Sequence, residues 1–266
     1  MPMASTDPAC TSGTFKAPDH WQTVDLISDL HLQASEPATF DAWHAHMQGT
    51  TADAVILLGD VFEVWVGDDA VARDPFLQDC AAVLQAASRR MTVGFMAGNR
   101  DFLVGQDFLQ RCGVQALQDP TLLVWGTQRV VLTHGDALCL GDEAYQRFRA
   151  LARTPSWQSQ FLSRPLDERL TLAQAMRAQS EAHNQSMASF ADADPVMTAQ
   201  WLEQLHSRHM IHGHTHRPAD HAVPCQPGAR RQVLSDWHIA AGQPRAEVLR
   251  LHADGRQERL PPCGLA

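Results

Sequence analysis

Short apolar runs alternate with segments of helical spacing through the first half of the chain. The runs predict strands, which cover Thr23–Ser28, Ala54–Leu58, Met91–Met96 and Val130–Thr133. The amphipathic segments between them predict helices near Pro37–Gln48, Pro75–Arg90 and Phe102–Arg111. This alternation favours an α/β domain in which helices cover sheets.

The pattern changes after His134. Residues 142–185 have helical spacing without a convincing strand, and another helix is expected near Pro195–His206. Strands return at Met210–Ile211, Arg231–Leu234 and Glu247–Leu251. We therefore predict one domain over residues 21–260, with a helical insertion over 142–207 that forms a lid.

The N-terminal segment is rich in Pro, Ser, Thr and Ala, which predicts a disordered leader over residues 1–20. It lacks the basic segment and apolar run of a secretory signal. No stretch of the chain approaches the roughly 18–20 apolar residues that span a bilayer. The six cysteines are scattered without a C-x-x-C pair, as is typical of a reducing compartment. We expect a cytoplasmic protein whose contact with a membrane is peripheral.

The charge balance argues against a nucleic-acid partner. The chain has 21 basic and 30 acidic residues, a net charge of −9, whereas proteins that bind duplex nucleic acid usually carry basic patches. Lys16 is the only Lys among the basic residues, so a site that ordinarily uses Lys must use Arg here.

Five short polar motifs follow the predicted strands in chain order. They are Asp29-Leu-His31, Gly59-Asp60, Gly98-Asn99, His134-Gly135-Asp136 and His212-Gly-His214-Thr-His216. In open α/β sheets, ligand sites lie outside the carboxyl ends of the strands, so these motifs should converge on one site. The glycines beside the polar residues allow close approach of the backbone.

The residue types in these motifs are those of a transition-metal site. The candidate ligands are Asp29, His31, Asp60, Asn99, His134, His214 and His216. This mixture of oxygen and nitrogen donors suits Mn²⁺, Fe²⁺ or Zn²⁺, whereas Mg²⁺ and Ca²⁺ prefer oxygen alone. Seven ligands are too many for one ion, but they fit two ions if one carboxylate bridges them.

The motifs resemble the signature of the calcineurin-like metallophosphoesterases, and the resemblance extends over residues 24–253. It implies an α/β fold, a two-sheet β-sandwich flanked by helices, that carries two divalent metal ions. By matching position, the first ion would be held by Asp29, His31 and His216, and the second by Asn99, His134 and His214, with Asp60 bridging. The nucleophile implied is a water or hydroxide that bridges the ions, because both ions lower its pKa.

One departure from the superfamily pattern concerns the leaving group. The superfamily commonly has His after the Asn, where an imidazole can protonate an alkoxide. Here the residue is Arg100, which cannot give up a proton but can neutralise charge on phosphoryl oxygens. Because a phosphate leaves without protonation, Arg100 favours a phosphoric anhydride substrate. We predict catalytic roles for Arg100 and Asp101, and we expect Asp101, Asp136 and Glu63 to orient the ligands.

Longer motifs resemble one subfamily, the UDP-2,3-diacylglucosamine diphosphatases of lipid A biosynthesis. These motifs are Gly59–Asp69, Gly98–Asp101, His134–Cys139 and Ile211–Pro218. The resemblance implies Mn²⁺-dependent hydrolysis of UDP-2,3-diacylglucosamine to UMP and 2,3-diacylglucosamine 1-phosphate. It also implies a peripheral location on the cytoplasmic face of the inner membrane.

The same resemblance implies a set of substrate contacts. They are Asn99, Arg100, Asp142, Tyr145, Arg177, Ser180, Asn184, Met187 and His214. Met187 departs from the subfamily, which commonly has Lys there, so Arg177 or another Arg would carry the charge.

The insertion itself suits a lipid. Residues 142–190 contain six Arg and five acidic residues, a net charge of +1, whereas the remainder of the chain sums to −10. With Trp157, Phe161 and Leu162, such helices suit acyl chains and an anionic membrane surface. A packed amphipathic helix has the same pattern, so both interpretations stay open.

Two other functions also stay open. A phosphodiesterase or pyrophosphatase that acts on a soluble nucleotide would use the same ligands. A non-catalytic binding module is disfavoured, because none of the seven ligands is replaced. Trp65, Trp237 and His212 either line the site or pack in the core, and packing is favoured.

Overall fold

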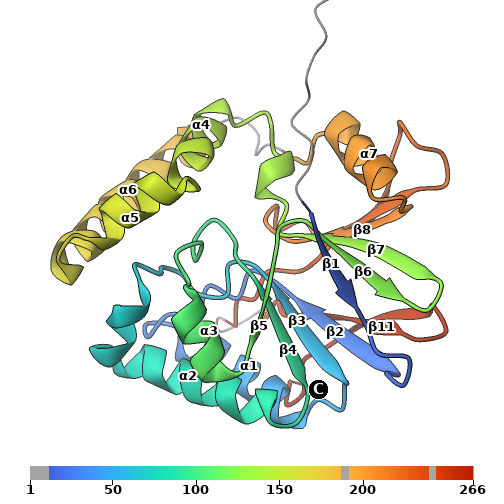
Figure 1. The fold of residues 1–266 in the computed structure, drawn as a ribbon, viewed down its shortest axis with the longest axis horizontal. Coiled ribbons are helices and arrows are strands. Elements are labelled where there is room, and N and C mark those ends of the chain that lie inside the picture. The colour runs from blue at the N-terminus through green and yellow to red at the C-terminus, as the bar shows by residue number, and fades with distance from the viewer. Residues whose placement is uncertain (1–11, 187–191, 240–243, 266) are drawn as a thin grey trace, which may run out of the picture.

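The computed structural model describes residues 12–186, 192–239 and 244–265, and its strands form two six-stranded sheets packed face to face (Figure 1). The first sheet has the order β12-β11-β2-β3-β4-β5, with β2 to β5 parallel. Its strands are β2 (Thr23–Ile27), β3 (Ala54–Leu58), β4 (Thr92–Met96), β5 (Gln115–Leu117), β11 (Val248–His252) and β12 (Gln257–Leu260).

The second sheet has the order β1-β6-β7-β8-β10-β9. Its strands are β1 (Gly13–Lys16), β6 (Thr121–Trp125), β7 (Gln128–Thr133), β8 (His209–His212), β9 (Ala219–Ala222) and β10 (Arg230–Val233). The outer face of this sheet is covered by helix α7 (Pro195–Gln204), where Leu202 packs with Met210 and Val131.

The central strands of the first sheet are apolar on both faces because both faces are covered. Leu26 and Ile56 pack toward the second sheet, where they belong to the same buried cluster as Leu132 and Ile211. Leu57 points the other way, into the layer of helices on the opposite face. These helices are α1 (Pro37–Gly49), α2 (Pro75–Ser88) and α3 (Gln106–Cys112). Burial on two sides explains why the strands appear in the sequence as continuous apolar runs.

Between β7 and β8 the chain forms three further helices, which we call the α4–α6 group. They are α4 (Glu143–Ala152), α5 (Pro155–Leu162) and α6 (Leu166–Ser186). Figure 1 shows this group apart from α1, α2 and α3, on the side where the parallel strands end. Aromatic rings connect it internally and to the sandwich, because Trp157 lies 6.1 Å from Phe148 and 6.0 Å from Phe102, measured between ring centroids.

The sandwich flanked by helices is confirmed, as are the strands and helices expected in the first half of the chain. The predicted leader over residues 1–20 is wrong for its second half. Gly13–Lys16 form β1, which pairs in parallel with β6, and residues 1–11 lie outside the described part. The reason is Phe15, which is buried between the sheets with its ring 5.9 Å from that of Trp21.

Two short 3₁₀ helices complete the described elements, η1 (Asp68–Ala72) and η2 (Asp136–Leu138). Within the described ranges, no helix combines the length and the apolar composition needed to cross a bilayer.

Candidate metal centre

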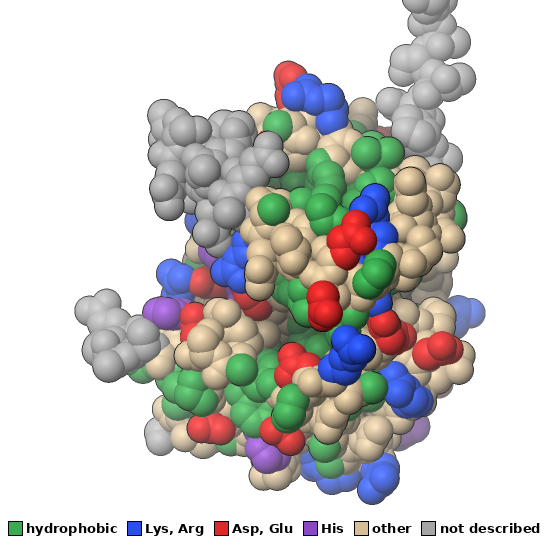
Figure 2. All heavy atoms as spheres, turned by 90° about the vertical axis from the view of Figure 1, so that its left-hand side faces the viewer, with side chains coloured by type: hydrophobic (Ala, Val, Ile, Leu, Met, Phe, Trp, Pro, Cys, Tyr) green, Lys and Arg blue, Asp and Glu red, His purple; other side chains and the backbone are tan. Residues whose placement is uncertain are grey.

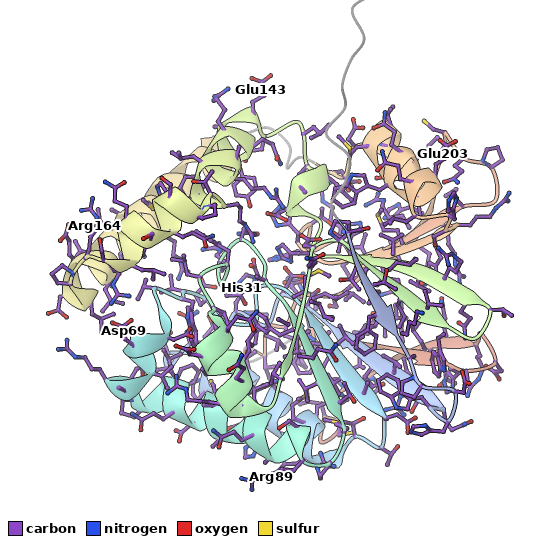
Figure 3. The ribbon with its side chains drawn as sticks, in the orientation of Figure 1. His31, Asp69, Arg89, Glu143, Arg164 and Glu203 are labelled. Carbon is purple, nitrogen blue, oxygen red and sulfur yellow. The ribbon has the colours of Figure 1, made fainter. Side chains whose placement is uncertain are left out.

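The loops that follow five strands meet at the carboxyl ends of the parallel strands and carry the predicted ligands. Strands β2, β3, β4, β7 and β8 lead into these loops. Six predicted ligands form two groups whose donor atoms lie within 4.8 Å of one another: Asp29, His31 and His216, and Asp60, His134 and His214. Figure 3 shows His31 in this region, between the strands of the first sheet and the α4–α6 group.

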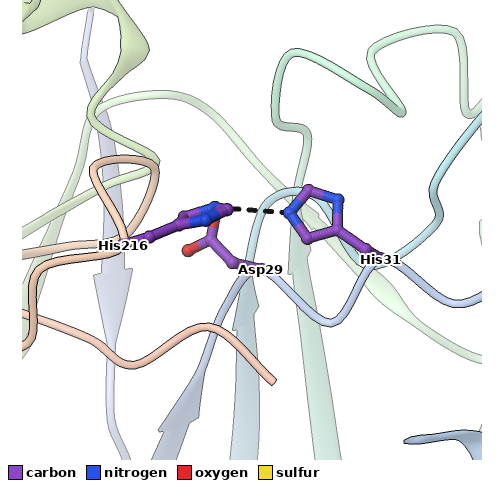
Figure 4. A group of neighbouring side chains, drawn as sticks. All are labelled: Asp29, His31 and His216. Carbon is purple, nitrogen blue, oxygen red and sulfur yellow. Dashed lines mark hydrogen bonds and ion pairs between the residues drawn. The ribbon is translucent and has the colours of Figure 1, made fainter. Parts of the chain in front are cut away.

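The first group is drawn in Figure 4. His31 Nε2 lies 3.3 Å from His216 Nε2, which in turn lies 3.3 Å from Asp29 Oδ1. Asp29 is fully buried, and its Oδ2 accepts hydrogen bonds from Ser28 Oγ at 2.6 Å and from the backbone N–H of His214 at 2.9 Å. The carboxylate is therefore held at the meeting point of two imidazoles.

The second group is centred on His134, which is fully buried. Its Nε2 lies 3.6 Å from Asp60 Oδ1 and 2.9 Å from Asn99 Oδ1, so Asn99 belongs to this group as well. The ring centroid of His214 lies 5.1 Å from that of His134. All seven predicted ligands thus lie in one of the two groups.

The ligand loops have an unusual backbone. Six non-glycine residues in the described part have positive φ, and five of them are predicted ligands: Asp29, His31, Asp60, His214 and His216. Such conformations are strained for residues with a side chain and concentrate at functional sites. Backbone hydrogen bonds hold the strained residues, because Asp29 N donates to Gly59 O at 3.1 Å and His31 N to Asp60 O at 3.0 Å.

Two glycines allow these loops to approach each other closely. A Cβ on Gly98 would lie 2.2 Å from Asp60 Oδ1, and a Cβ on Gly213 would lie 2.2 Å from Asp29 Oδ2. Neither position can hold a larger residue without displacing a carboxylate of the centre. The Gly98-Asn99 and Gly213-His214 pairs in the sequence are therefore required by packing.

Neighbouring oxygens fix how the imidazoles are oriented. His134 Nδ1 lies 2.9 Å from the carbonyl oxygen of Leu58, and His31 Nδ1 lies 2.8 Å from Glu63 Oε2. A carbonyl oxygen only accepts, so His134 Nδ1 carries its proton there and Nε2 faces the centre. His216 Nδ1 is similarly 3.6 Å from Asp236 Oδ2, a residue without a signal in the sequence.

The carboxylates of the centre favour positive charge beside them, and this changes the pKa values of the neighbouring groups. Although burial opposes a charged imidazole, the carboxylates of Asp60 and Asp29 raise the pKa of His134 to about 9. Burial and the nearby His134 lower the pKa of His214 to about 4. Burial alone would raise the pKa of Asp29, but the hydrogen bond with His216 holds it well below the usual range.

These atoms fit divalent cations. A neutral His134 directs the lone pair of Nε2 toward Asp60 Oδ1 and Asn99 Oδ1, which are both acceptors. The same holds at the other group, where His31 Nε2 faces His216 Nε2. Acceptors that converge in this way repel one another unless a proton or a cation lies between them. The donor set of imidazole nitrogen and carboxylate oxygen is the kind that transition-metal ions prefer.

Asp101 has the contacts of a residue that orients the ligands, which is one of the two roles that the sequence predicts for it. It is fully buried, and its carboxylate accepts hydrogen bonds from the backbone N–H groups of Gly98 at 2.7 Å and Val61 at 2.8 Å. Burial and the charge of Asp60 raise its pKa to about 6. These hydrogen bonds join the two loops that carry Asn99 and Asp60, which is consistent with a role in orienting the ligands.

Arg100 lies at the edge of the centre, where its backbone N–H donates to Asp60 Oδ1 at 2.8 Å. Its Nη1 lies 3.3 Å from Glu63 Oε1, and Arg177 Nη1 of α6 lies 2.5 Å from the same oxygen. Glu63 is 8% exposed at its side chain, and it also holds His31. The structure therefore brings together Arg100, Arg177 and His31 around one buried carboxylate.

The other predicted substrate contacts lie on the α4–α6 group. Asp142 Oδ1 caps α4 by accepting from Tyr145 N at 2.9 Å, and the Tyr145 ring stacks 6.2 Å from that of His214. Ser180 and Asn184 are on α6, but their side chains are outside the described part of the chain. Met187 lies outside the described residues.

Two arginines, one on α4 and one directly after it, were not predicted for the site. Arg153 Nη2 donates to the carbonyl oxygen of Gly98 at 2.7 Å, and Arg149 Nε donates to Asp136 Oδ2 at 2.8 Å. Their sequence signal is weak, because arginines are frequent on any exposed helix. Trp65 and Trp237 are buried in the cluster beneath the helices of the first sheet, and His212 is buried beside Arg231.

The sequence model of the calcineurin-like phosphoesterases matches residues 23–218, which include all seven predicted ligands. The UDP-2,3-diacylglucosamine hydrolase of Bordetella pertussis is 40% identical, covering 87% of this chain and 92% of the relative. Proteins of the same name from Chromohalobacter salexigens and Aromatoleum aromaticum are 42% and 43% identical. These two matches cover 83% and 80% of this chain, and 91% and 88% of the relatives.

Proposed function

The chain belongs to the calcineurin-like phosphoesterase family, and on this premise we propose that it hydrolyses the pyrophosphate bond of UDP-2,3-diacylglucosamine. The products are UMP and 2,3-diacylglucosamine 1-phosphate, in the pathway of lipid A biosynthesis. The observation that carries the proposal is Arg100, which stands beside the two ligand groups where an alcohol-releasing phosphoesterase needs an acid.

We propose that two Mn²⁺ ions occupy the centre. Asp29, His31 and His216 would hold one ion, Asn99, His134 and His214 would hold the other, and Asp60 would contact both. When bound, the ions lower the pKa of water and neutralise charge on the phosphoryl group. The imidazole-rich donor set supports Mn²⁺ over Mg²⁺, which prefers an oxygen shell.

The residues of the chain bind the diphosphate and neutralise its charge. The side chain of Arg100 is 26% exposed, so its guanidinium can contact phosphoryl oxygens, and Arg177 adds a second positive charge from α6. Whichever phosphorus of the anhydride is attacked, the leaving group is a phosphate and needs no proton, which is consistent with an arginine at position 100. Glu63 keeps both guanidinium groups beside the centre.

The insertion over residues 142–207 is proposed to cover the substrate as a lid. The proposed substrate contacts are Asn99, Arg100, Asp142, Tyr145, Arg177, Ser180, Asn184, Met187 and His214. Tyr145 supports this assignment, because its ring stacks on His214 and so places α4 beside the centre.

We further propose that the enzyme works at the cytoplasmic face of the inner membrane as a peripheral protein. Several large apolar side chains of the α4–α6 group and the loop before it are exposed: Leu140, Leu151, Leu162, Leu170 and Met176. Figure 2 shows hydrophobic side chains gathered on the face of the molecule that this group occupies. Apolar surface of this kind, among arginines, supports binding of acyl chains and anionic headgroups.

The reaction is tested by phosphorus NMR with UDP-2,3-diacylglucosamine and Mn²⁺. We expect the diphosphate signals to be replaced by those of two phosphate monoesters. UDP-N-acetylglucosamine, which lacks the acyl chains of the proposed substrate, serves as the comparison. Faster turnover of that soluble nucleotide would favour the alternative enzyme that acts on soluble nucleotides.

A matched pair of variants separates the centre from general effects on the protein. Asp60→Asn removes the carboxylate that is proposed to contact both ions, and should abolish turnover. Asp79→Asn makes the same change at an exposed position of α2 and should leave turnover intact. Equal activity of the two variants would contradict the role of Asp60.

A further inference from the structure

Arg169, near the start of α6, is almost completely buried although it carries a charge. Its side chain is 3% exposed, whereas that of its partner Asp69 is 61% exposed. A buried guanidinium is costly unless its N–H groups are paired. This arginine therefore requires hydrogen-bond acceptors from the β-sandwich domain.

The turn Val66–Asp69 provides these acceptors. Arg169 Nη1 donates to Val66 O at 2.5 Å and to Asp69 Oδ1 at 2.9 Å, while Nη2 pairs with Asp69 Oδ2. The remaining Nε donates to Arg164 O at 3.0 Å. All three nitrogens of the guanidinium thus have a partner, and the contact with Asp69 is bidentate.

Gly67 provides the space for this guanidinium. Its φ is +130°, and a Cβ at this position would lie 2.3 Å from Arg169 Nη1. A side chain at position 67 would therefore displace the arginine. The contact with Arg169 thus gives Val66, Gly67 and Asp69 a structural role outside the metal centre.

Arg177, which lies beside the metal centre, is on the same face of α6 as the buried Arg169. Ala173 and Arg177 follow Arg169 by four and eight residues, a spacing that places all three side chains on one side of α6. Ala173 packs against the hydrophobic cluster that lies between the first sheet and helices α1, α2 and α3. Two turns and about 12 Å further along the helix axis, Arg177 reaches Glu63.

We propose that Arg169 and the turn Val66–Asp69 form an anchor that sets the position of α6 and thereby places Arg177 beside Glu63 for contact with the substrate. Arg169 is a positioning residue, since it acts through Arg177 and does not touch the substrate. The inference rests on the proposed function, in which Arg177 binds the diphosphate.

The test compares Arg169→Gln, Arg177→Gln and the double variant, with UDP-2,3-diacylglucosamine and Mn²⁺. We expect Arg169→Gln to raise KM about tenfold, as the loss of one charge-assisted hydrogen bond would, with a change in kcat within about twofold. In the Arg177→Gln background, the second substitution should add almost nothing, because the group it positions is already gone. Additive effects in the double variant would overturn the proposal.

Arg164→Gln is the matched control. Arg164 pairs with Glu168 on the exposed surface of the same segment, and such pairs contribute little. This variant should keep the KM of the parent protein. An equal rise of KM in Arg164→Gln and Arg169→Gln would overturn the proposal, because any loss of charge on the segment would then have the same effect.

Asp69 supplies the second variant if Arg169→Gln does not fold. Asp69→Asn changes a mostly exposed side chain, and should raise KM by about threefold because Val66 O still binds the arginine. Asp69→Glu keeps the carboxylate and should restore most of the loss. If the KM of Asp69→Glu is no lower than that of Asp69→Asn, the ion pair between Asp69 and Arg169 does not position α6.

Hydrogen exchange without substrate separates this proposal from the proposed function. Amides of residues 166–177 should exchange faster in Asp69→Asn and Arg169→Gln than in Arg164→Gln, while those of β2 and β3 stay unchanged. Unchanged exchange in α6 would overturn the anchor. If the parent protein fails to hydrolyse the substrate, the proposed function fails, and the exchange result alone decides on the anchor.

Discussion

The hydroxyl of Tyr145 donates a hydrogen bond to Asp136 Oδ2 at 2.5 Å, and this contact joins α4 to the loop that carries His134. Arg149 Nε donates to the same oxygen at 2.8 Å. Burial of Asp136 opposes its charge, but the guanidinium of Arg149 holds the pKa of this carboxyl well below its usual range. The carboxylate of Asp136 is therefore the point at which α4 is attached to the metal centre.

Replacing Asp136 with Asn should destabilise the protein by about 2–3 kcal/mol, because it removes the charged acceptor of the buried hydrogen bonds from Tyr145 and Arg149. Urea unfolding at constant Mn²⁺ measures the loss. Asp119→Asn is the matched control, since burial and the charge of Asp136 raise the pKa of Asp119 and disfavour its carboxylate. That variant should lose little stability, and equal losses in both would contradict the role given to Asp136.

Chelation of divalent ions should abolish activity, and Mn²⁺ should restore it better than Mg²⁺ because of the imidazole nitrogens in both groups. Asp60→Ala should lower kcat and metal content strongly, because Asp60 would bind both ions. We expect a larger loss than the factor of about 10 to 100 that is typical when a residue supporting a ligand is replaced. Metal content and kcat of dialysed protein provide the measurement. Turnover that survives exhaustive dialysis against EDTA would exclude the proposed mechanism.

Arg100→Ala should lower kcat by about 10²- to 10³-fold, as the loss of one electrostatic donor typically does, and should change KM less. Arg100→His should relatively favour aryl phosphodiesters, whose leaving groups benefit from an acid. Both variants are compared with the parent by kcat/KM on the diphosphate and on the aryl ester. Metal content should be unchanged in both.

Arg89→Ala is the control for these variants, since Arg89 is exposed at the end of α2, far from His31 in Figure 3. It should retain full activity on both substrates. Equal losses on both substrates in Arg100→Ala and Arg100→His would mean that Arg100 only positions phosphate, and its value as a marker of anhydride substrates would be lost.

The metal centre was predictable because its information is local in the sequence. Each ligand lies in the loop that follows a strand, as Asp29 follows β2 and Asp60 follows β3, and the carboxyl ends of these strands meet in one place. Asp101 shows the limit of this reasoning. The sequence leaves both a catalytic role and a role in orienting the ligands open for it, and only the folded chain shows its hydrogen bonds with the backbone N–H groups of Gly98 and Val61.

The remainder depends on contacts between distant segments. Arg169 and Asp69 are 100 residues apart, and no periodicity in the sequence indicates that they pair. The edge strand β12 is only partly buried along its length, so it lacks the alternation that identifies a strand. β1 was missed for a related reason, since a single buried residue, Phe15, holds this short strand in place.

The stability of the sandwich should fall in acid because of Asp25, a fully buried residue of β2. Burial opposes its charge, but hydrogen bonds from Arg250, His46 and Thr50 lower its pKa to about 2. A carboxyl with a depressed pKa stabilises the fold above its ordinary value near 4, and this contribution of about 2 kcal/mol is lost as the pH falls through 2. Asp25→Asn should therefore be less stable than the parent at pH 7, and the difference should shrink between pH 4 and pH 2. Urea unfolding with a chelator present measures both proteins without bound metal, and a difference that stays constant with pH would show that the charge of Asp25 contributes nothing.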